Sequence, residues 1–246
     1  NSNKVSANVL KDNDVRNVDL DGKEILVINV PRVDGHKRPV YINDNVMRGT
    51  FRRNHEGDYH CSESEVRAML RDSDDAGNDG ILIEHYGMDD IDADTLSAYR
   101  NRFRVFNEDH IWNSIDNRQF LKNLGGYVVD RENGKEGLTL AGLLMFGKGT
   151  SICERFGKFR MDYIDLTNLL PDSRWSDRLT YDGRWENNLY NFYTRVQAKL
   201  TADIRRPFRM EGMARIDDTP VHKAVREALT NSIIHSDYFV TGGVLR

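Results

Sequence analysis

The chain has 246 residues, of which 30% are charged and 39% hydrophobic, and its formal net charge is −4. This length suits one large or two modest domains, and apolar residues spread throughout the chain exclude global disorder. The slight acidic excess excludes a uniformly basic nucleic-acid coat, so any contact with nucleic acid requires a local basic patch.

The sequence carries no signal for membrane insertion or secretion. It has no apolar run of about 18 residues, and residues 1–20 lack the apolar core of a signal peptide. Cys61 and Cys153 form no CxxC pair, which indicates a reducing compartment and no zinc site. We therefore expect a cytoplasmic protein with no membrane partner and no metal site of its own. Asn1 begins no recognisable element, so a segment upstream of it is expected to be missing.

The first part of the chain predicts short strands followed by one helix. Asp21-Gly22 favours the type I′ turn of a β-hairpin. Ser62, followed by Glu65, forms a capping box that predicts a helix extending to about Arg71. The strands are predicted at 15–20, 23–30, 39–42 and 49–53.

Basic side chains gather around the ends of these strands. A β-scaffold that displays them can neutralise phosphates without reading base sequence. Tyr41, Phe51 and Tyr59 lie among the cations and could stack on exposed bases. The alternative is ordinary solubilising charge, paired with acids such as Asp34 and Asp44, and both interpretations stay open. The candidate nucleic-acid-binding residues are Arg32, Lys37, Arg38, Arg48, Arg52 and Arg53.

Four motifs in this part of the chain follow a recognisable order. They are Val-Pro-Arg at 30–32, Arg-Pro-Val-Tyr-Ile-Asn at 38–43, Gly-Thr-Phe-Arg-Arg-Asn at 49–54 and Gly-Asp-Tyr-His-Cys at 57–61. Together they resemble the second half of the Schlafen AlbA-type domain found in bacterial transcriptional regulators. The resemblance covers residues 1–72 and implies that this part binds DNA or RNA. The family's best-known acidic and lysine positions lie in the first half, which this sequence lacks, and are not carried over.

An acidic stretch and a mixed region follow. Residues 73–93 are rich in aspartate and predict a solvated linker. Arg100, Arg102 and Arg104 are expected to pair with these acids or to face solvent. The segment at 138–147, Leu-Thr-Leu-Ala-Gly-Leu-Leu-Met-Phe-Gly, resembles the same regulators. Helices are predicted around 94–103, 116–124, 139–146 and 185–206, and strands at 81–85, 127–130 and 159–166.

The last predicted helix starts at Thr219-Pro220, an N-cap followed by a first-turn proline. Glu227, Asn231 and His235 follow one another at intervals of four and share one helix face. Spacing alone favours a polar edge that faces solvent, because most surface helices carry such a stripe. The adjoining face, predicted to pack inward, comprises Val221, Val225, Ala228, Leu229 and Ser232.

Residues 226–238 resemble the Glu-x-x-x-Asn box that opens a histidine-kinase-like (GHKL) ATP-binding domain, in the RecG-related form of the same regulators. The resemblance implies that Glu227 is a general base that orients the attacking water and that Asn231 helps hold magnesium on the nucleotide. His235 and Tyr238 match the tail of this motif, without an assigned role. The sequence contains no Asp-x-Gly-x-Gly segment, and Gly242-Gly243 is a weak phosphate-loop signal. ATP and magnesium are therefore expected only in a longer protein.

These patterns predict an α+β protein with four parts. A partial Schlafen-type domain occupies 1–72, an acidic linker 73–93, a mixed middle domain 94–215 and the start of a GHKL-like domain 216–246. The predicted function is a DNA-binding transcriptional regulator coupled to nucleotide binding, with a homodimer as one possible assembly. The alternatives are an ATP hydrolase that uses Glu227 and Asn231 in a longer protein, and an interaction scaffold without activity. This chain alone is expected to lack ATPase activity.

Overall fold

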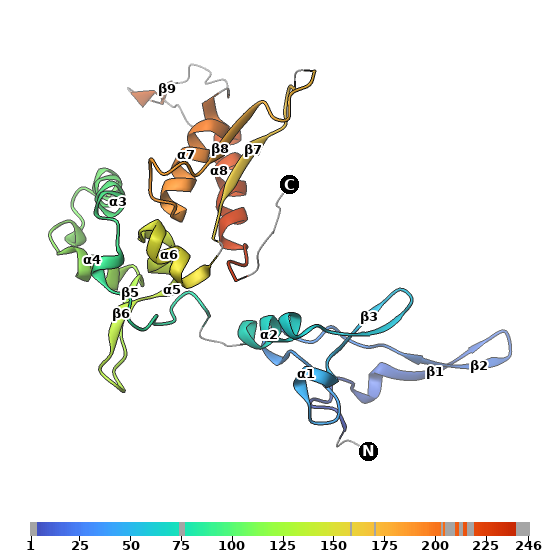
Figure 1. The fold of residues 1–246 in the computed structure, drawn as a ribbon. Helices are drawn as coiled ribbons and strands as arrows, with labels where there is room; N and C mark the ends of the chain where they lie inside the picture. Colours follow the sequence, from blue (N-terminus) through green and yellow to red (C-terminus); the bar gives the residue numbers. More distant parts are fainter. Residues whose placement is uncertain are drawn as a thin grey trace. The chain divides into compact units, whose positions relative to one another are not determined.

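The computed structural model divides the chain into two units, Asn1–Asn78 and Asp79–Arg246 (Figure 1). Both combine helices with two-stranded antiparallel sheets, which confirms the predicted α+β class. Among the helices described, none has the length and apolar character needed to cross a membrane. The structure describes residues 4–73, 77–157, 159–169, 171–202, 204, 210–211, 214–215 and 219–239.

The first unit is built from two hairpins and a ten-residue helix. Asp21 and Gly22 both have positive φ, 54° and 78°, which confirms the predicted type I′ turn between β1 and β2. The elements are η2 (Asp12–Asp14), β1 (Val15–Leu20), β2 (Lys23–Ile28), η3 (Gly35–Lys37), α1 (Val46–Gly49), β3 (Phe51–Asn54), β4 (Gly57–His60) and α2 (Glu63–Asp72).

The segment before β3 differs from its prediction. The expected strand at 39–42 is reduced to isolated bridges that join Tyr41 to Thr50 and Ile42 to Val5. Asn45 ends this stretch by accepting a hydrogen bond from the backbone N–H of Arg48, which starts the short helix α1. An N-cap asparagine therefore turns part of the predicted 49–53 strand into helix.

Few apolar side chains of the first unit are buried. Within the part of this unit that the structure describes, Cys61 and Val66 are the buried hydrophobic residues. The β1–β2 hairpin exposes apolar side chains on both faces, because Leu26 and Ile28 alternate with Ile25 along β2. Hydrogen bonds between paired strands and the α2 capping box therefore stabilise much of the local structure of this unit.

The second unit contains the main hydrophobic core. The N-cap predicted at Thr219 is confirmed, because its side chain accepts a backbone N–H of the following turn. Asp92, Asp116 and Thr139 cap the helices that follow them in the same way. The elements are η4 (Met88–Asp90), α3 (Ala93–Phe106), η5 (Ile111–Asn113), α4 (Asn117–Asn123), β5 (Tyr127–Val129), β6 (Glu136–Leu138), α5 (Leu140–Phe146), α6 (Gly149–Phe156), β7 (Asp162–Asp165), β8 (Asp177–Thr180), α7 (Leu189–Ala202), β9 (Met210–Glu211), β10 (Ala214–Arg215) and α8 (Pro220–Ile234).

The acidic linker predicted at 73–93 is too long. Ile83 and Ile91 are buried in the core of the second unit. Asp90 accepts hydrogen bonds from the Ser151 hydroxyl (2.8 Å) and the Gly87 amide (2.8 Å), so its charge supports packing. The expected strand at 81–85 is a single bridge between Leu82 and Thr139. Acidic composition suggested solvent exposure, whereas the Asp90 carboxylate accepts from a backbone and a hydroxyl donor.

The last helix, α8, packs on α7. Phe192 and Val196 on α7 form a small core cluster with Leu229 on α8. The predicted helix at 185–206 is α7, which starts four residues later because Asn188 accepts the Asn191 backbone N–H. Residues 203 and 205–209 lie outside the described part of the chain, as does Gly242-Gly243. The boundary predicted at 216 stays a prediction.

Tyr238 offers a test of packing beyond α8. Its hydroxyl donates to the Ile233 carbonyl at 2.7 Å, and burial raises its pKa to about 12. The ordinary tyrosine value is about 10. The resulting stabilisation is therefore complete below pH 10 and is lost as pH rises through about 12.

We expect the wild type to lose stability more steeply than Tyr238→Phe across this alkaline range, because phenylalanine has no proton to release. Urea unfolding followed by far-UV circular dichroism measures the difference. Tyr99, whose pKa is also raised by burial, is present in both proteins and cancels. Parallel curves for the two proteins would contradict the assignment.

Candidate nucleic-acid interface

The β3–β4 hairpin places the two adjacent arginines on opposite faces. Arg52 pairs across the strands with Tyr59, and Arg53 pairs with Asp58. Directly opposite residues share a face, and successive residues alternate between faces. Each face of this hairpin therefore carries one arginine, and Arg52 shares its face with a tyrosine.

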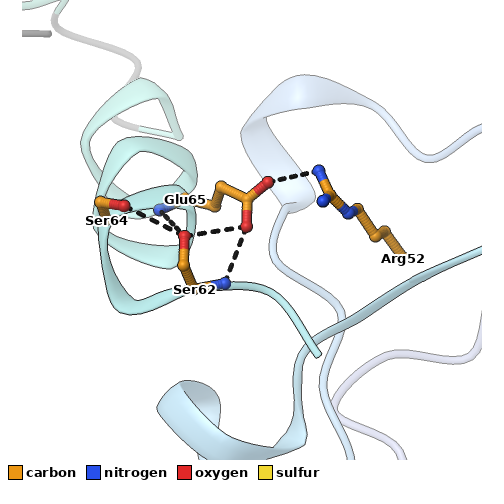
Figure 2. Close-up of polar contacts among 4 residues, drawn as sticks. All are labelled: Arg52, Ser62, Ser64 and Glu65. Carbon is orange, nitrogen blue, oxygen red and sulfur yellow. Dashed lines mark hydrogen bonds and ion pairs between the residues drawn. The ribbon is translucent and has the colours of Figure 1, made fainter. Parts of the chain in front are cut away.

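Arg52 is bound to the start of α2 (Figure 2). Its Nη1 lies 2.5 Å from Oε1 of Glu65. The other carboxylate oxygen of Glu65 accepts the Ser62 amide at 2.7 Å and the Ser62 hydroxyl at 2.9 Å. The Ser62 amide and hydroxyl, and then Arg52, hold the pKa of Glu65 below its ordinary value. Glu65 is therefore ionised near neutral pH and offsets the charge of Arg52.

Arg53 and Arg38 also have partners within the unit. Arg53 Nη1 lies 3.1 Å from Asp58 Oδ1, and both side chains are largely exposed, so the pair is weak. Arg38 donates from Nε (2.9 Å) and Nη2 (2.5 Å) to the Val33 carbonyl and closes the loop before Pro39. Three of the six candidate cations therefore contribute to the local structure.

Arg32, Lys37 and Arg48 are different. All three are exposed, and within the described residues none of their side chains forms a hydrogen bond or an ion pair. Asp34, which the sequence offered as a partner, accepts the backbone N–H of His36 at 3.2 Å. Among the six candidates, these three residues are the free cations; Arg32 and Lys37 lie between β2 and α1, and Arg48 lies on α1.

Two exposed aromatic rings accompany the cations. Phe51 and Tyr59 are exposed on β3 and β4, and Phe51 packs against His60 with ring centroids 4.0 Å apart. Tyr41 is half-buried. A phenyl and a phenol ring beside arginines can stack on unpaired bases, which is the usual way that single strands are bound.

The second candidate site, on α8, is a solvent-exposed stripe. Glu227, Asn231 and His235 are exposed, and Asn231 Nδ2 donates to Glu227 Oε1 at 3.5 Å. Neither Glu227 nor Asn231 lines the cavity between α3 and α7 or the cavity lined by Ile81, Arg155 and Phe239. Across the described residues, no group of three or more His, Cys, Asp or Glu side chains is arranged to hold a metal ion. The roles of Glu227 and Asn231 stay predictions.

The buried face of α8 differs from its prediction. His222 and Leu229 are buried, and Ile233 packs against both core clusters of the unit. Val221 and Ala228, expected inside, are exposed. The His222 Nδ1 atom lies 2.7 Å from the hydroxyl of the capping residue Thr219, whereas its buried Nε2 atom has no hydrogen-bond partner among the described residues.

Sequence reasoning missed a charged cavity in the second unit. It is lined by side chains from α3, from the turn before α7 and from α7 itself, including Asp94, Trp185 and Arg195. The segments lie about ninety residues apart in sequence, so no local spacing connects them. A tryptophan flanked by Arg184 and Glu186 was the available signal.

Part of the chain is similar to a family model that has no assigned function. A family model described as "Domain of unknown function (DUF8451)" matches residues 67–162. No curated protein matches the chain. Among solved structures, the crystal structure of the DIP2311 protein from Corynebacterium diphtheriae is similar, with 17% identity and a TM-score of 0.45. The alignment covers 93% of this chain and 41% of that one, so this chain spans about two-fifths of that protein's length.

Proposed function

We propose that the first unit binds nucleic acid, DNA in the first instance, through its exposed basic surface. The observation that carries the proposal is the set of three exposed cations without intramolecular partners, Arg32, Lys37 and Arg48. Phosphate oxygens provide the charge that such groups lack in the free protein. The exposed rings of Phe51 and Tyr59 supply stacking surfaces in the same unit.

The resemblance to the Schlafen AlbA-type domain supports this proposal and extends it. Residues 1–72 are proposed to be the second half of such a domain, and α8 the first helix of a GHKL-like module. The whole protein is then a transcriptional regulator that couples nucleic-acid binding to a nucleotide. In this proposal, Arg52 breaks its ion pair with Glu65 and binds a phosphate group when nucleic acid binds.

Replacing the three free cations tests the proposal. The triple variant Arg32→Gln, Lys37→Gln, Arg48→Gln is expected to weaken binding to duplex DNA by at least about tenfold at low salt. The slope of log K against log salt should fall by about three, because each lost phosphate contact removes roughly one unit. Fluorescence anisotropy with labelled duplex and single strands, over a salt series, measures both quantities.

Two controls sharpen this experiment. A second triple variant, Arg104→Gln, Arg131→Gln, Lys148→Gln, makes the same change of charge at exposed positions of the other unit and should bind as the wild type does. Glu65→Gln keeps the capping box, because glutamine also serves at that position, but removes the charge that competes for Arg52. This variant should bind at least as tightly as the wild type. Equal losses in both triple variants would rule out the assigned surface.

A second candidate function, ATP hydrolysis, has one supporting observation on α8. The Glu227 carboxylate and Asn231 amide lie on one exposed face and are joined by a hydrogen bond. A general base and a magnesium-bound amide one turn apart are what the GHKL resemblance implies. In a polypeptide that continues past Arg246, Glu227→Ala is expected to abolish magnesium-dependent ATP turnover.

His235→Ala is the matched control for that experiment, because His235 lies one turn further along the same exposed stripe. Turnover measured by phosphate release should persist in this variant. Unchanged turnover in Glu227→Ala would exclude Glu227 as the base. The scaffold alternative is favoured if neither nucleic acid nor nucleotide raises the melting temperature, since a ligand of the native state must raise it.

A further inference from the structure

A cavity of about 450 Å³ lies between α3, the turn at 183–186 and α7. Its lining includes three carboxylates, Asp92, Asp94 and Glu186, and two guanidinium groups, Arg184 and Arg195. This volume lies within the range of small-molecule sites. The unusual property of the cavity is that both signs of charge line one space.

The floor of the cavity is a hydrogen-bonded polar network. Asn188, which is fully buried, donates from Nδ2 to the Thr95 hydroxyl (3.2 Å) and to the Gly147 carbonyl (3.0 Å). Asn191 donates to the same hydroxyl at 2.8 Å and to the Glu186 carbonyl at 3.0 Å. The network joins α3 to α7 and to the turn before α7 that contributes Glu186.

Two of the three carboxylates, Asp92 and Glu186, are held in place, each through one oxygen. Asp92 Oδ2 accepts the Thr95 amide at 2.9 Å and its hydroxyl at 2.5 Å. Glu186 Oε2 accepts the Gly149 amide at 2.6 Å. Asp92 Oδ1 and Glu186 Oε1 have no such bond in the described structure, and Asp94 is exposed in the first turn of α3. Oriented carboxylates with unused acceptor oxygens are suited to bind an ammonium group.

The cations of the cavity are positioned independently of these carboxylates. The Arg195 guanidinium carbon lies 5.1 Å from the centroid of the Trp185 ring, a cation–π contact. Arg184 Nε lies 3.6 Å from Asp182, outside the cavity lining. Among the described residues, no ion pair joins Arg184 or Arg195 to a carboxylate of the cavity. The carboxylates and the guanidinium groups therefore line the same cavity without forming ion pairs with one another.

We propose that this cavity binds a small zwitterion of the amino-acid class. The ammonium group binds the free oxygens of Asp92, Asp94 and Glu186, and the carboxylate binds Arg195. A simple anion is disfavoured because three carboxylates line the cavity, and a simple cation lacks any group for the guanidinium. A molecule that carries both charges satisfies both sides of the cavity.

Isothermal titration calorimetry with the whole chain tests the proposal. The probes are glycine, glutamine, lysine and glutamate, with butylamine and butyrate as single-charge references. At least one amino acid is expected to bind at least about tenfold more tightly than both references, since one charged hydrogen bond provides that much discrimination. No binding by any amino acid, or equal binding by either reference, would overturn the proposal.

Two variants test the two ends of the ligand. Arg195→Gln and Asp94→Asn are each expected to weaken binding at least about tenfold. Arg104→Gln and Asp89→Asn make the same changes at exposed positions outside the lining and should bind normally. Retained binding in Arg195→Gln or in Asp94→Asn would overturn the two-ended assignment. Circular dichroism confirms that each variant is folded.

Discussion

Phe120→Ala is expected to lower the free energy of unfolding of the second unit by about 3–5 kcal/mol. Phe120 is 1% exposed, and its ring contacts Tyr99, Phe103 and Trp112 at centroid distances of 6.2, 5.4 and 6.1 Å. Arg100 also lies over the ring, at 4.9 Å. Alanine removes the transfer free energy of the ring and leaves a cavity that neighbouring rings cannot fill without leaving their own contacts.

Urea unfolding followed by tryptophan fluorescence measures this loss for the second unit alone. The chain has three tryptophans, Trp112, Trp175 and Trp185, and all belong to that unit. Phe106→Ala is the matched control, because Phe106 ends α3 and is 75% exposed. Its loss should stay below about 1 kcal/mol, the value of its contact with Arg102 and of a surface substitution. If Phe120→Ala and Phe106→Ala lowered the free energy of unfolding equally, Phe120 would not belong to the hydrophobic core.

Gly142→Ala is expected to cost about 3 kcal/mol or more. A Cβ atom at Gly142 would lie 1.9 Å from the carbonyl oxygen of Gly126 and 2.7 Å from its carbonyl carbon. Both obstacles are backbone, so relief requires moving α5 away from the turn before β5, and overpacking of this kind is strongly destabilising. Alanine favours a helix over glycine by only about 1 kcal/mol, so the clash dominates.

The same denaturation experiment measures the effect of Gly142→Ala. Gly80→Ala is its control, because a Cβ atom at Gly80 would meet no atom within 4 Å. We expect the stability of this control to change by less than about 0.5 kcal/mol. If Gly142→Ala unfolds at the wild-type urea concentration, the close approach of the two glycine backbones is wrong.

Helix starts were predictable because their determinants are local. Ser62, Asp92, Asp116 and Thr139 each cap a backbone N–H three residues ahead, so the sequence contains both partners of the interaction. The Asp21-Gly22 turn was predictable for the same reason, since its φ angles favour these residue types. Helix α6 was missed because Lys148 at its N-cap makes no side-chain capping bond.

Burial was harder to predict where polar groups enter the core. His222 is buried with its Nδ1 atom beside the Thr219 hydroxyl, and its burial changes which side of α8 faces inward. Asp90 bonds to Ser151, sixty-one residues away, so the acidic stretch gave no sign that it packs on α6. Spacing rules assume that polar residues face water, and they fail where another side chain in the fold bonds to the polar group.

The candidate site shows the same division. The contact of Arg53 with Asp58 follows from strand register, because both residues flank a short turn. The contact of Arg52 with Glu65 depends on how α2 packs, and no spacing signals it. Residue type therefore identified the six cations, whereas the structure was needed to separate the three with intramolecular partners from the free Arg32, Lys37 and Arg48.

The placement of the indole side chains has an experimental use beyond stability. The first unit contains none, so an oligonucleotide that contacts only this unit cannot quench an indole by direct stacking. A change in intrinsic emission upon addition of DNA would therefore report a response transmitted into the second unit. The unmodified protein thus contains its own fluorescent probe for communication between its two units.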